Sequence, residues 1–331
     1  MMSSKLNDAL AKLNKNFGSG SVFHLGENEA FEKLERISTG SLGLDVITGG
    51  GYPLGRIIEL FGWESSGKST LCIHAIAEAQ AMGKRCAFVD MEHAFDKNYA
   101  EALGVNTEEL IFCQPSSGEE AIEITKTLAD TGEVGLVVVD SVATMVPSVE
   151  SEGEAGESKM GVHARLMSQA MRVLSPIASR NNCTLIFVNQ LRQKIGVMYG
   201  SPDVTTGGNA LKFYSSIRIK LTSSKSAGNK EKVDGVDRQV SNLVTATTEK
   251  NKTYPPLQKH SFQLRFGIGI DAKEEIVDMA IALGLIDKKG AWYSYEGTQL
   301  GQGKKAVFAL LDENPDLEET LRDEIIKHYN R

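Results

Sequence analysis

The sequence predicts an α/β fold in which a mostly parallel, twisted sheet is covered by helices. Apolar strand-like runs alternate with helical ones over residues 37–266, which is typical of strand–helix–strand units with parallel strands. A glycine-containing motif at 62–69, GWESSGKS, lies between an apolar run and a helical segment. With 331 residues and 41% hydrophobic content, the chain can bury one large core and carry smaller appendages.

An amphipathic helix is expected first, because Leu6, Ala9, Leu10, Leu13 and Phe17 recur three or four residues apart before a Gly/Ser stretch. Its apolar face needs a partner surface. The helix either folds back on its own domain or docks on a neighbouring subunit, and the residues alone favour neither. We assign residues 1–32 to this helix and its linker.

The core is expected over residues 33–268. Its strands are runs of apolar and β-branched residues bounded by turn formers, and its helices carry apolar residues at helical spacing. We expect strands at 57–61, 85–90, 109–113, 135–140, 184–188, 215–221 and 241–249, and helices near 67–82, 97–103, 117–130 and 160–180.

Residues 269–331 are expected to form a small separate α/β domain. An amphipathic segment at 272–284, an aromatic patch at 292–295 and a helical segment at 316–329 support this division. The segment from Asp271 onward carries 13 acidic and 8 basic side chains, a net of −5, so most of the chain's net charge of −7 lies there. This charge argues against DNA binding by the whole surface and leaves room for a local basic groove.

No apolar run approaches the roughly 20 residues that a membrane helix needs, and the first residues lack a signal-peptide core, so we expect a cytoplasmic protein with no membrane contact. The four cysteines, Cys72, Cys86, Cys113 and Cys183, lie in apolar segments without C-x-x-C spacing. Buried free thiols are therefore expected rather than disulfides or a zinc site.

The motif at 62–69 fits the pattern G-x-x-x-x-G-K-[ST], which is typical of a loop that binds nucleotide phosphates, here called the cradle. Gly62 and Gly67 let backbone N–H groups point at the phosphates, Lys68 adds a cation, and Ser69 offers a hydroxyl to Mg²⁺. The alternative is a glycine-rich turn with a structural role only. The strand before it and the helix after it favour the phosphate site.

Two strand ends carry carboxylates that suit this site. Asp140 follows the run Leu136–Val139 and is placed where P-loop enzymes support Mg²⁺, although buried strands also end in Asp for turn reasons. Glu92 follows the expected strand 85–90, one strand–helix unit after the cradle, and could orient and deprotonate water, with a solvated surface acid as the alternative. His93 is assigned a structural role.

A third strand ends at Gln190, whose amide can contact a phosphate. The long segment that follows carries cations, glycines and apolar residues, which could hold a nucleic-acid backbone and wedge between bases, or could be a simple surface loop. A second loop at 150–160 is acidic. Lys250 and Lys252 are, on charge alone, two solvated lysines.

Together these residues resemble the RecA-type recombinases. The likeness runs almost end to end, from 17–21 through 37–41 to 291–295. It rests on several motifs that occur together in one order: Glu64-Ser65-Ser66 in the cradle, Glu92-His93, Val139-Asp140-Ser141, Asn189-Gln190 and the segment 205–214.

The resemblance implies a P-loop NTPase core of RecA type and an ATP-dependent filament on single-stranded DNA. Such a filament pairs its strand with homologous double-stranded DNA and exchanges strands, with DNA-stimulated hydrolysis of ATP in the presence of Mg²⁺. It also implies a DNA-repair role, an SOS co-protease scaffold, and partnership with a LexA-type repressor and a single-stranded-DNA-binding protein.

The resemblance assigns roles residue by residue. Nucleotide contacts fall on Gly62, Glu64, Ser65, Ser66, Gly67, Lys68, Ser69, Thr70, Asp96, Tyr99 and Asp140, with the metal on Ser69 and Asp140. Catalytic roles fall on Lys68, Glu92 as activator of water, Gln190 as γ-phosphate sensor, and Lys250 and Lys252 reaching a neighbour's ATP. DNA contacts fall on Met160, Arg165, Arg172, Arg192, Lys194, Ile195, Gly196, Val197, Met198, Gly207, Gly208 and Asn209. Subunit contacts fall on Leu6, Leu10, Leu13 and Phe213.

The sequence departs from the usual pattern of the RecA-type recombinases in three ways. Trp63 replaces a small residue or proline in the cradle, and Glu249 places an acid directly before Lys250. The sequence ends at Arg331 without a long acidic tail, so we expect little tail-based restraint of DNA binding. Segment 223–238 is polar and receives no function. A ring-shaped helicase on the same core and a nucleotide-gated scaffold are the rival interpretations.

Overall fold

The computed structural model describes residues 4–18, 21–24, 34–151, 161–193 and 203–329. The chain divides into two units, Met1–Glu35 and Arg36–Arg331. The first unit holds helix α1 (Ser4–Phe17), and the side chain of Asn14 exchanges hydrogen bonds with the backbone of Val22 beyond it. Among the described residues, none of the helices has the length and apolar character that a bilayer crossing requires.

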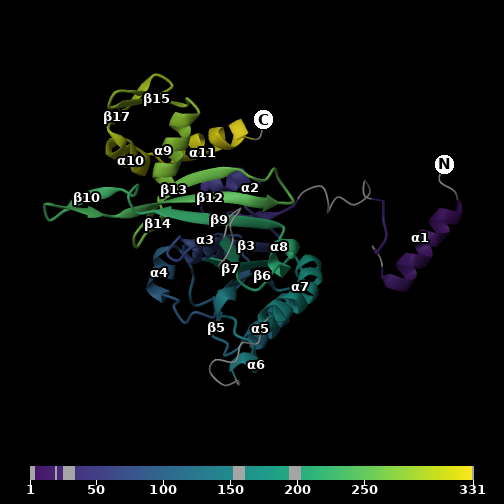
Figure 1. The fold of residues 1–331 in the computed structure, drawn as a ribbon. Helices are drawn as coiled ribbons and strands as arrows, with labels where there is room; N and C mark the ends of the chain where they lie inside the picture. Colours follow the sequence, from purple (N-terminus) through teal and green to yellow (C-terminus); the bar gives the residue numbers. More distant parts are fainter. Residues whose placement is uncertain (1–3, 19–20, 25–33, 152–160, 194–202, 330–331) are drawn as a thin grey trace. The chain divides into compact units, whose positions relative to one another are not determined.

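The second unit is built on a large mixed sheet (Figure 1). Along the sheet the strands follow the order β14-β13-β12-β9-β3-β7-β6-β4-β5, with β8 paired to β7. The strands from β9 to β5 pair in parallel, whereas β12, β13 and β14 pair antiparallel. Their bounds are β3 Ile57–Gly62, β4 Arg85–Asp90, β5 Ile111–Cys113, β6 Val134–Asp140, β7 Thr184–Gln193, β8 Asp203–Thr205, β9 Ile217–Ser224, β12 Ser241–Asn251, β13 Lys259–Arg265 and β14 Gly269–Ile270.

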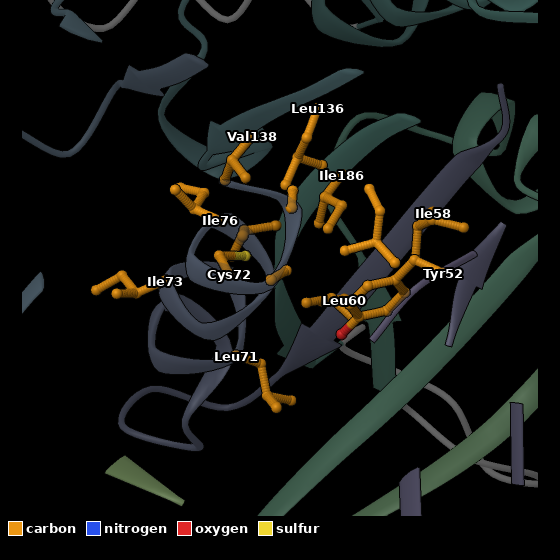
Figure 2. Packing of buried hydrophobic residues seen from close by; sticks show 14 of the residues in the cluster. Tyr52, Ile58, Leu60, Leu71, Cys72, Ile73, Ile76, Leu136, Val138 and Ile186 are labelled. Atoms are coloured by element: carbon orange, nitrogen blue, oxygen red, sulfur yellow. The ribbon is translucent and has the colours of Figure 1, made fainter. Parts of the chain in front are cut away.

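Helices cover both faces of the parallel part, as the alternating strand pattern predicts. On β6, Leu136 and Val138 join one core cluster with helix α3, while Val137 and Val139 join another with helices α5 and α7. Figure 2 shows the first cluster, in which Leu71, Cys72 and Ile76 of α3 gather with side chains of the sheet. Helices α3 (Lys68–Ala81) and α4 (Lys97–Ala102) contribute to the first cluster, and helices α5 (Gly118–Asp130) and α7 (Val162–Arg180) contribute to the second.

Shorter elements complete the core. They are β1 Arg36–Ile37, α2 Leu42–Thr48, β2 Tyr52–Pro53, the 3₁₀ turn Val142–Thr144, α6 Ser148–Ser151 and α8 Ala210–Tyr214. Three of the four cysteines are buried and Cys113 is half-buried, and all are free thiols.

The C-terminal part has its own core, formed by side chains such as Ile276, Tyr293 and Leu321. Its elements are α9 Ala272–Ala282, β15 Ile286–Lys289, β16 Trp292–Tyr295, β17 Thr298–Gln302, α10 Lys304–Glu313 and α11 Pro315–Tyr329. A buried carboxylate fastens it to the core: Glu275 accepts the hydroxyl of Ser41 at 2.5 Å and the amide of Leu42 at 2.9 Å.

The structure differs from the sequence-based expectations in several places; strand β13 and helix α10, for example, were not among the expected elements. Strand β7 continues past Gln190 to Gln193 and pairs antiparallel with β8, so the segment expected as a loop begins and ends as a two-stranded β-ribbon. Segment 223–238, to which we assigned no function, contributes most of a hairpin formed by β10 (Lys230–Val233) and β11 (Val236–Gln239), seen at the edge of Figure 1. Short polar strands of this kind escape a search for apolar runs.

Candidate nucleotide-binding site

Four neighbouring strands deliver the expected polar side chains to one edge of the sheet. In the register of the parallel strands, Gly62 of β3 is opposite Gln190 of β7, and Asp90 of β4 is opposite Asp140 of β6. Because β3, β7, β6 and β4 are adjacent and parallel, their carboxyl ends form one continuous edge. The motifs that are scattered along the sequence therefore meet.

The cradle has the backbone that a phosphate loop requires. Gly67 caps helix α3 with a φ of 90°, a left-handed value that favours glycine. A Cβ on Gly62 would lie 2.4 Å from the carbonyl oxygen of Leu221, so a side chain does not fit there. Ser65 also has a positive φ, 57°, and Ser66 is buried.

Lys68 is folded into the cradle. It is only 8% exposed, and its Nζ donates to the carbonyl oxygen of Trp63 at 2.8 Å. Burial lowers the pKa of this amine, and the nearby carboxylates of Asp140 and Glu92 oppose the shift. The cation is thus held by weak neutral partners that a phosphate can replace.

Ser69 and Asp140 form a hydroxyl–carboxylate pair at the first turn of α3. The Ser69 hydroxyl donates to Oδ2 of Asp140 at 2.6 Å. Burial raises the pKa of Asp140 to about 6, because the ionised form is poorly solvated; the hydrogen bond from Ser69 opposes this rise. Two hard oxygen donors therefore lie together next to the cradle.

Glu92 lies exposed at the end of β4, in the position expected for a group that meets water. Its Oε1 accepts the hydroxyl of Ser141 at 2.5 Å and Nε2 of Gln190 at 2.8 Å. Gln190, the expected γ-phosphate sensor, thus contacts the expected base directly. The turn that carries Glu92 is fixed by Asp90, which accepts the Glu92 amide at 3.1 Å.

The residues expected at adenine lie beside the cradle helix. Asp96 caps helix α4 by accepting the amide of Tyr99 at 3.0 Å, and both side chains belong to the segment after β4. The hydroxyl of half-buried Tyr99 lies 3.3 Å from Oγ1 of Thr70. This contact connects α4 to the first turn of α3.

The DNA-binding expectations are only partly within the described residues; Met160, Lys194, Ile195, Gly196, Val197 and Met198 lie outside them. Arg165 and Arg172 are exposed and two turns apart on one side of α7. Arg192 is exposed near the end of β7, and Asn209 is the N-cap residue of α8.

Gly207 and Gly208 both have positive φ, 76° and 74°. A Cβ on Gly208 would lie 2.8 Å from the Cβ of Ala164 in α7, so this glycine turn needs the small residue for close packing as well. The turn therefore lies against the helix that carries Arg165.

Lys250 is half-buried rather than simply solvated, contrary to the interpretation from charge alone, whereas Lys252 is exposed. Nζ of Lys250 donates to the carbonyl oxygens of Lys212 at 2.7 Å and Phe213 at 2.9 Å, at the end of α8. Burial, followed by the charges of Lys252 and Arg218, lowers the pKa of Lys250 to about 8. Phe213 on the same short helix is 68% exposed, which suits a contact with another subunit.

Sequence reasoning missed a buried polar group behind this edge. Glu59, in the middle of β3, is fully buried and pairs with Arg218 of β9 at 2.5 Å. Asn189 and Thr206 join it through further hydrogen bonds. A carboxylate inside the apolar run 57–61 was the available signal, because a buried charge requires partners.

Comparisons with known proteins identify the family of the chain. The family model described as the RecA N-terminal domain matches residues 4–271, and the model described as the RecA C-terminal domain matches residues 274–330. The chain belongs to the RecA family.

RecA-family proteins of several bacteria align with nearly the whole chain. Protein RecA of Bordetella petrii is 50% identical over 310 residues, covering 93% of this chain and 85% of that protein. Protein RecA of Allochromatium vinosum is 50% identical over 323 residues, covering 96% and 91%. The crystal structure of the RadB recombinase superposes with a TM-score of 0.53 and 25% identity, covering 71% of this chain and 98% of that one.

As a RecA-family protein, the chain is an ATP-dependent recombinase that acts in DNA recombination, in repair and in the response to DNA damage. Its enzymatic activity is DNA-dependent hydrolysis of ATP. It binds single-stranded and double-stranded DNA and assembles into homo-oligomeric filaments.

Proposed function

We propose that the edge formed by Gly62, Asp140 and Gln190 is the site where this recombinase binds and hydrolyses ATP. The observation that carries the proposal is the contact between Gln190 and Glu92 at 2.8 Å beside the cradle. It joins the expected sensor of the γ-phosphate to the expected base. The cradle amides from Glu64 to Thr70 and Lys68 hold the phosphates, and Asp96 and Tyr99 flank the adenine.

Ser69 and Asp140 suit Mg²⁺, which prefers oxygen ligands and keeps several waters. Their oxygens are 2.6 Å apart, and Asp140 is a carboxylate whose charge burial leaves poorly solvated, so a cation is a fitting partner. When bound, the ion supplies neutralisation of charge on the β- and γ-phosphates. Glu92 orients the attacking water and takes its proton.

We further propose that the site is completed by a second copy of the chain. Lys250 lies on β12 and Lys252 follows one residue after its end, and their amines contact the carbonyls of α8 rather than this protomer's cradle. In an assembly they would add positive charge at a neighbour's γ-phosphate, with Phe213 in the contact. The exposed side chains of Leu6 and Leu13 on α1, with half-buried Leu10, would pack on another subunit.

The DNA path is assigned to the loops that follow Gln190 and precede α7. Arg165, Arg172 and Arg192 would contact phosphates, and Gly207 with Gly208 would let the backbone approach the strand. The same role for Met160 and for residues 194–198 rests on the sequence.

The cellular location and the partner proteins are proposed from the recombinase activity. We place the protein in the cytoplasm, where a bacterial chromosome lies, and expect a LexA-type repressor and a single-stranded-DNA-binding protein as partners. We divide the chain at 1–32, 33–268 and 269–331 into a subunit-packing segment, the ATPase core and a small C-terminal domain.

The test of the proposal compares ATP hydrolysis with and without single-stranded DNA, followed by strand exchange between homologous substrates. Strong stimulation by DNA together with strand exchange is expected. A protein that unwinds forks but never exchanges strands would favour a helicase. Lys68→Ala should abolish ATP-dependent assembly, measured by sedimentation with a nonhydrolysable ATP analogue; unchanged sedimentation would contradict the assignment of Lys68.

A further inference from the structure

A buried carboxylate that the proposed chemistry does not use lies directly behind the nucleotide edge. Glu59 has no exposed surface, and both of its oxygens have partners. Oε2 accepts Nε of Arg218 at 2.5 Å, and Oε1 accepts Nδ2 of Asn189 at 2.9 Å. Burying a carboxylate is costly unless each oxygen is paired, and here both oxygens of Glu59 are paired.

Arg218 is held from two other sides. Its guanidinium lies 4.5 Å from the centre of the Phe61 ring, and Glu249 approaches it at 3.8 Å from the more exposed side. Stacking on Phe61 and the charge of Glu249 thus hold the guanidinium of Arg218 in place. Because Glu59 is hydrogen-bonded to this guanidinium, its carboxylate is held in place as well.

Asn189 connects this pair to two functional segments. Its Oδ1 accepts the backbone amide of Gln190 at 2.9 Å and the hydroxyl of Thr206 at 2.6 Å. Its Nδ2 donates to the carbonyl oxygen of Thr206 at 3.1 Å as well as to Glu59. One side chain therefore joins the strand end that carries the sensor to the residue that begins the glycine turn.

The ion pair decides which way this amide points. A carboxylate only accepts hydrogen bonds, so the NH₂ group of Asn189 must face Glu59, and Oδ1 must face Gln190 and Thr206. A reversed amide would place oxygen against oxygen in a buried site. The Glu59–Arg218 pair thus determines the orientation of Asn189.

We propose that Asn189 is a positioning residue that couples Gln190 to the DNA-facing turn at 206–209, and that the buried Glu59–Arg218 pair orients it. DNA contact at Gly207, Gly208 and Asn209 then acts on Gln190 and Glu92 through Asn189. This inference rests on the proposed roles of those residues. It predicts that loss of the Asn189 contacts lowers the stimulation of ATP hydrolysis by DNA.

The test is a reciprocal exchange of amide and carboxylate. Asn189→Asp alone sets a carboxylate against Glu59, and Glu59→Gln alone gives Arg218 or Asn189 a donor where each needs an acceptor. In the double variant, the amide nitrogen introduced at position 59 can donate to the carboxylate introduced at position 189, while the amide oxygen accepts Arg218. The donor to the carbonyl oxygen of Thr206 is not restored, so the recovery is partial. The double variant keeps the net charge of the buried group.

The readout is the ratio of the hydrolysis rate with single-stranded DNA to the rate without it. This ratio does not change when part of a sample is misfolded, because inactive protein lowers both rates equally. We expect each single variant to lower the ratio about tenfold, which corresponds to an ordinary coupling between two sites, and the double variant to recover to within about threefold of wild type. Circular dichroism and thermal melting establish which variants are folded.

Thr206→Val provides a second variant outside the ion pair. It removes the hydroxyl that Asn189 accepts at 2.6 Å and keeps the shape of the side chain, so the ratio should fall about fivefold, while the matched change Thr205→Val should leave it near wild type. Glu249→Gln, on the exposed side of Arg218, should also have little effect.

Unchanged ratios in Thr206→Val and in the folded single variants, or a double variant no better than the single ones, would overturn the proposal. If either single variant fails to fold, the outcome rests on the double variant, which should stay within about threefold of wild type, and on Thr206→Val, which should fall about fivefold. A wild-type protein without any stimulation by DNA would instead refute the proposed function and the inference with it.

Discussion

Replacing Glu92 by Gln should stop the chemical step of ATP hydrolysis and leave the site assembled. The amide oxygen of Gln can still accept the Ser141 hydroxyl and Nε2 of Gln190, the two contacts now made at 2.5 and 2.8 Å. What disappears is a group that can take a proton from water. Loss of a general base lowers rates by about 10²- to 10⁴-fold, equivalent to roughly 3 to 5 kcal/mol in the barrier.

Two assays separate this effect from a binding defect. Phosphate release is measured under single turnover with saturating single-stranded DNA, and DNA affinity is measured by fluorescence anisotropy in the presence of ATP. The rate should fall by at least about a hundredfold. ATP-dependent DNA affinity should be retained, because the cradle and Lys68 are unchanged.

Glu101→Gln is the matched control, because Glu101 is an exposed acid on α4 that contacts Thr107 at 2.6 Å. Its rate should equal that of wild type. Hydrolysis by Glu92→Gln within about threefold of wild type would show that Glu92 is not the base. Loss of ATP-dependent DNA binding in that variant would show that it serves mainly as a structural acceptor.

The remaining predictions concern charge, domain attachment and assembly. The pKa of Lys250 is lowered to about 8, so its amine is charged below that pH and neutral above it. ATP-dependent sedimentation should therefore weaken as the pH rises through 8, and Lys250→Arg should depend less on pH. The same pH dependence in both proteins would refute a role for the Lys250 charge in assembly. Glu275→Gln should lower the free energy of unfolding by about 1 to 3 kcal/mol, measured with urea, because the acceptor of the Ser41 hydroxyl and Leu42 amide is weakened. Leu13→Asp on the apolar face of α1 should reduce ATP-dependent sedimentation, whereas Lys15→Asp on the opposite face should not; equal loss in both would point to charge instead.

Much of the fold could be read from local patterns. The strand 85–90 has the bounds expected from its apolar run, and α3 begins at Lys68, one residue inside the expected helix. These signals are reliable because side-chain periodicity and the requirements of a phosphate loop act over a few neighbouring residues. The hairpin β10–β11 and the β7–β8 ribbon were missed because they depend on pairing between polar segments, which leaves no apolar period.

The candidate site divides in the same way. The cradle, Glu92, Asp140 and Gln190 could be predicted from the sequence alone, because each is marked by a short local pattern.

Which of these groups are in contact could not be predicted without the three-dimensional structure. Gln190 lies 98 residues from Glu92, and Glu59 lies 159 residues from Arg218, yet each pair is in hydrogen-bond contact. The order of strands in the sheet brings them together, and strand order follows from the packing of the whole core rather than from any local stretch. The burial that raises the pKa of Asp140 and lowers that of Lys250 arises from the same packing.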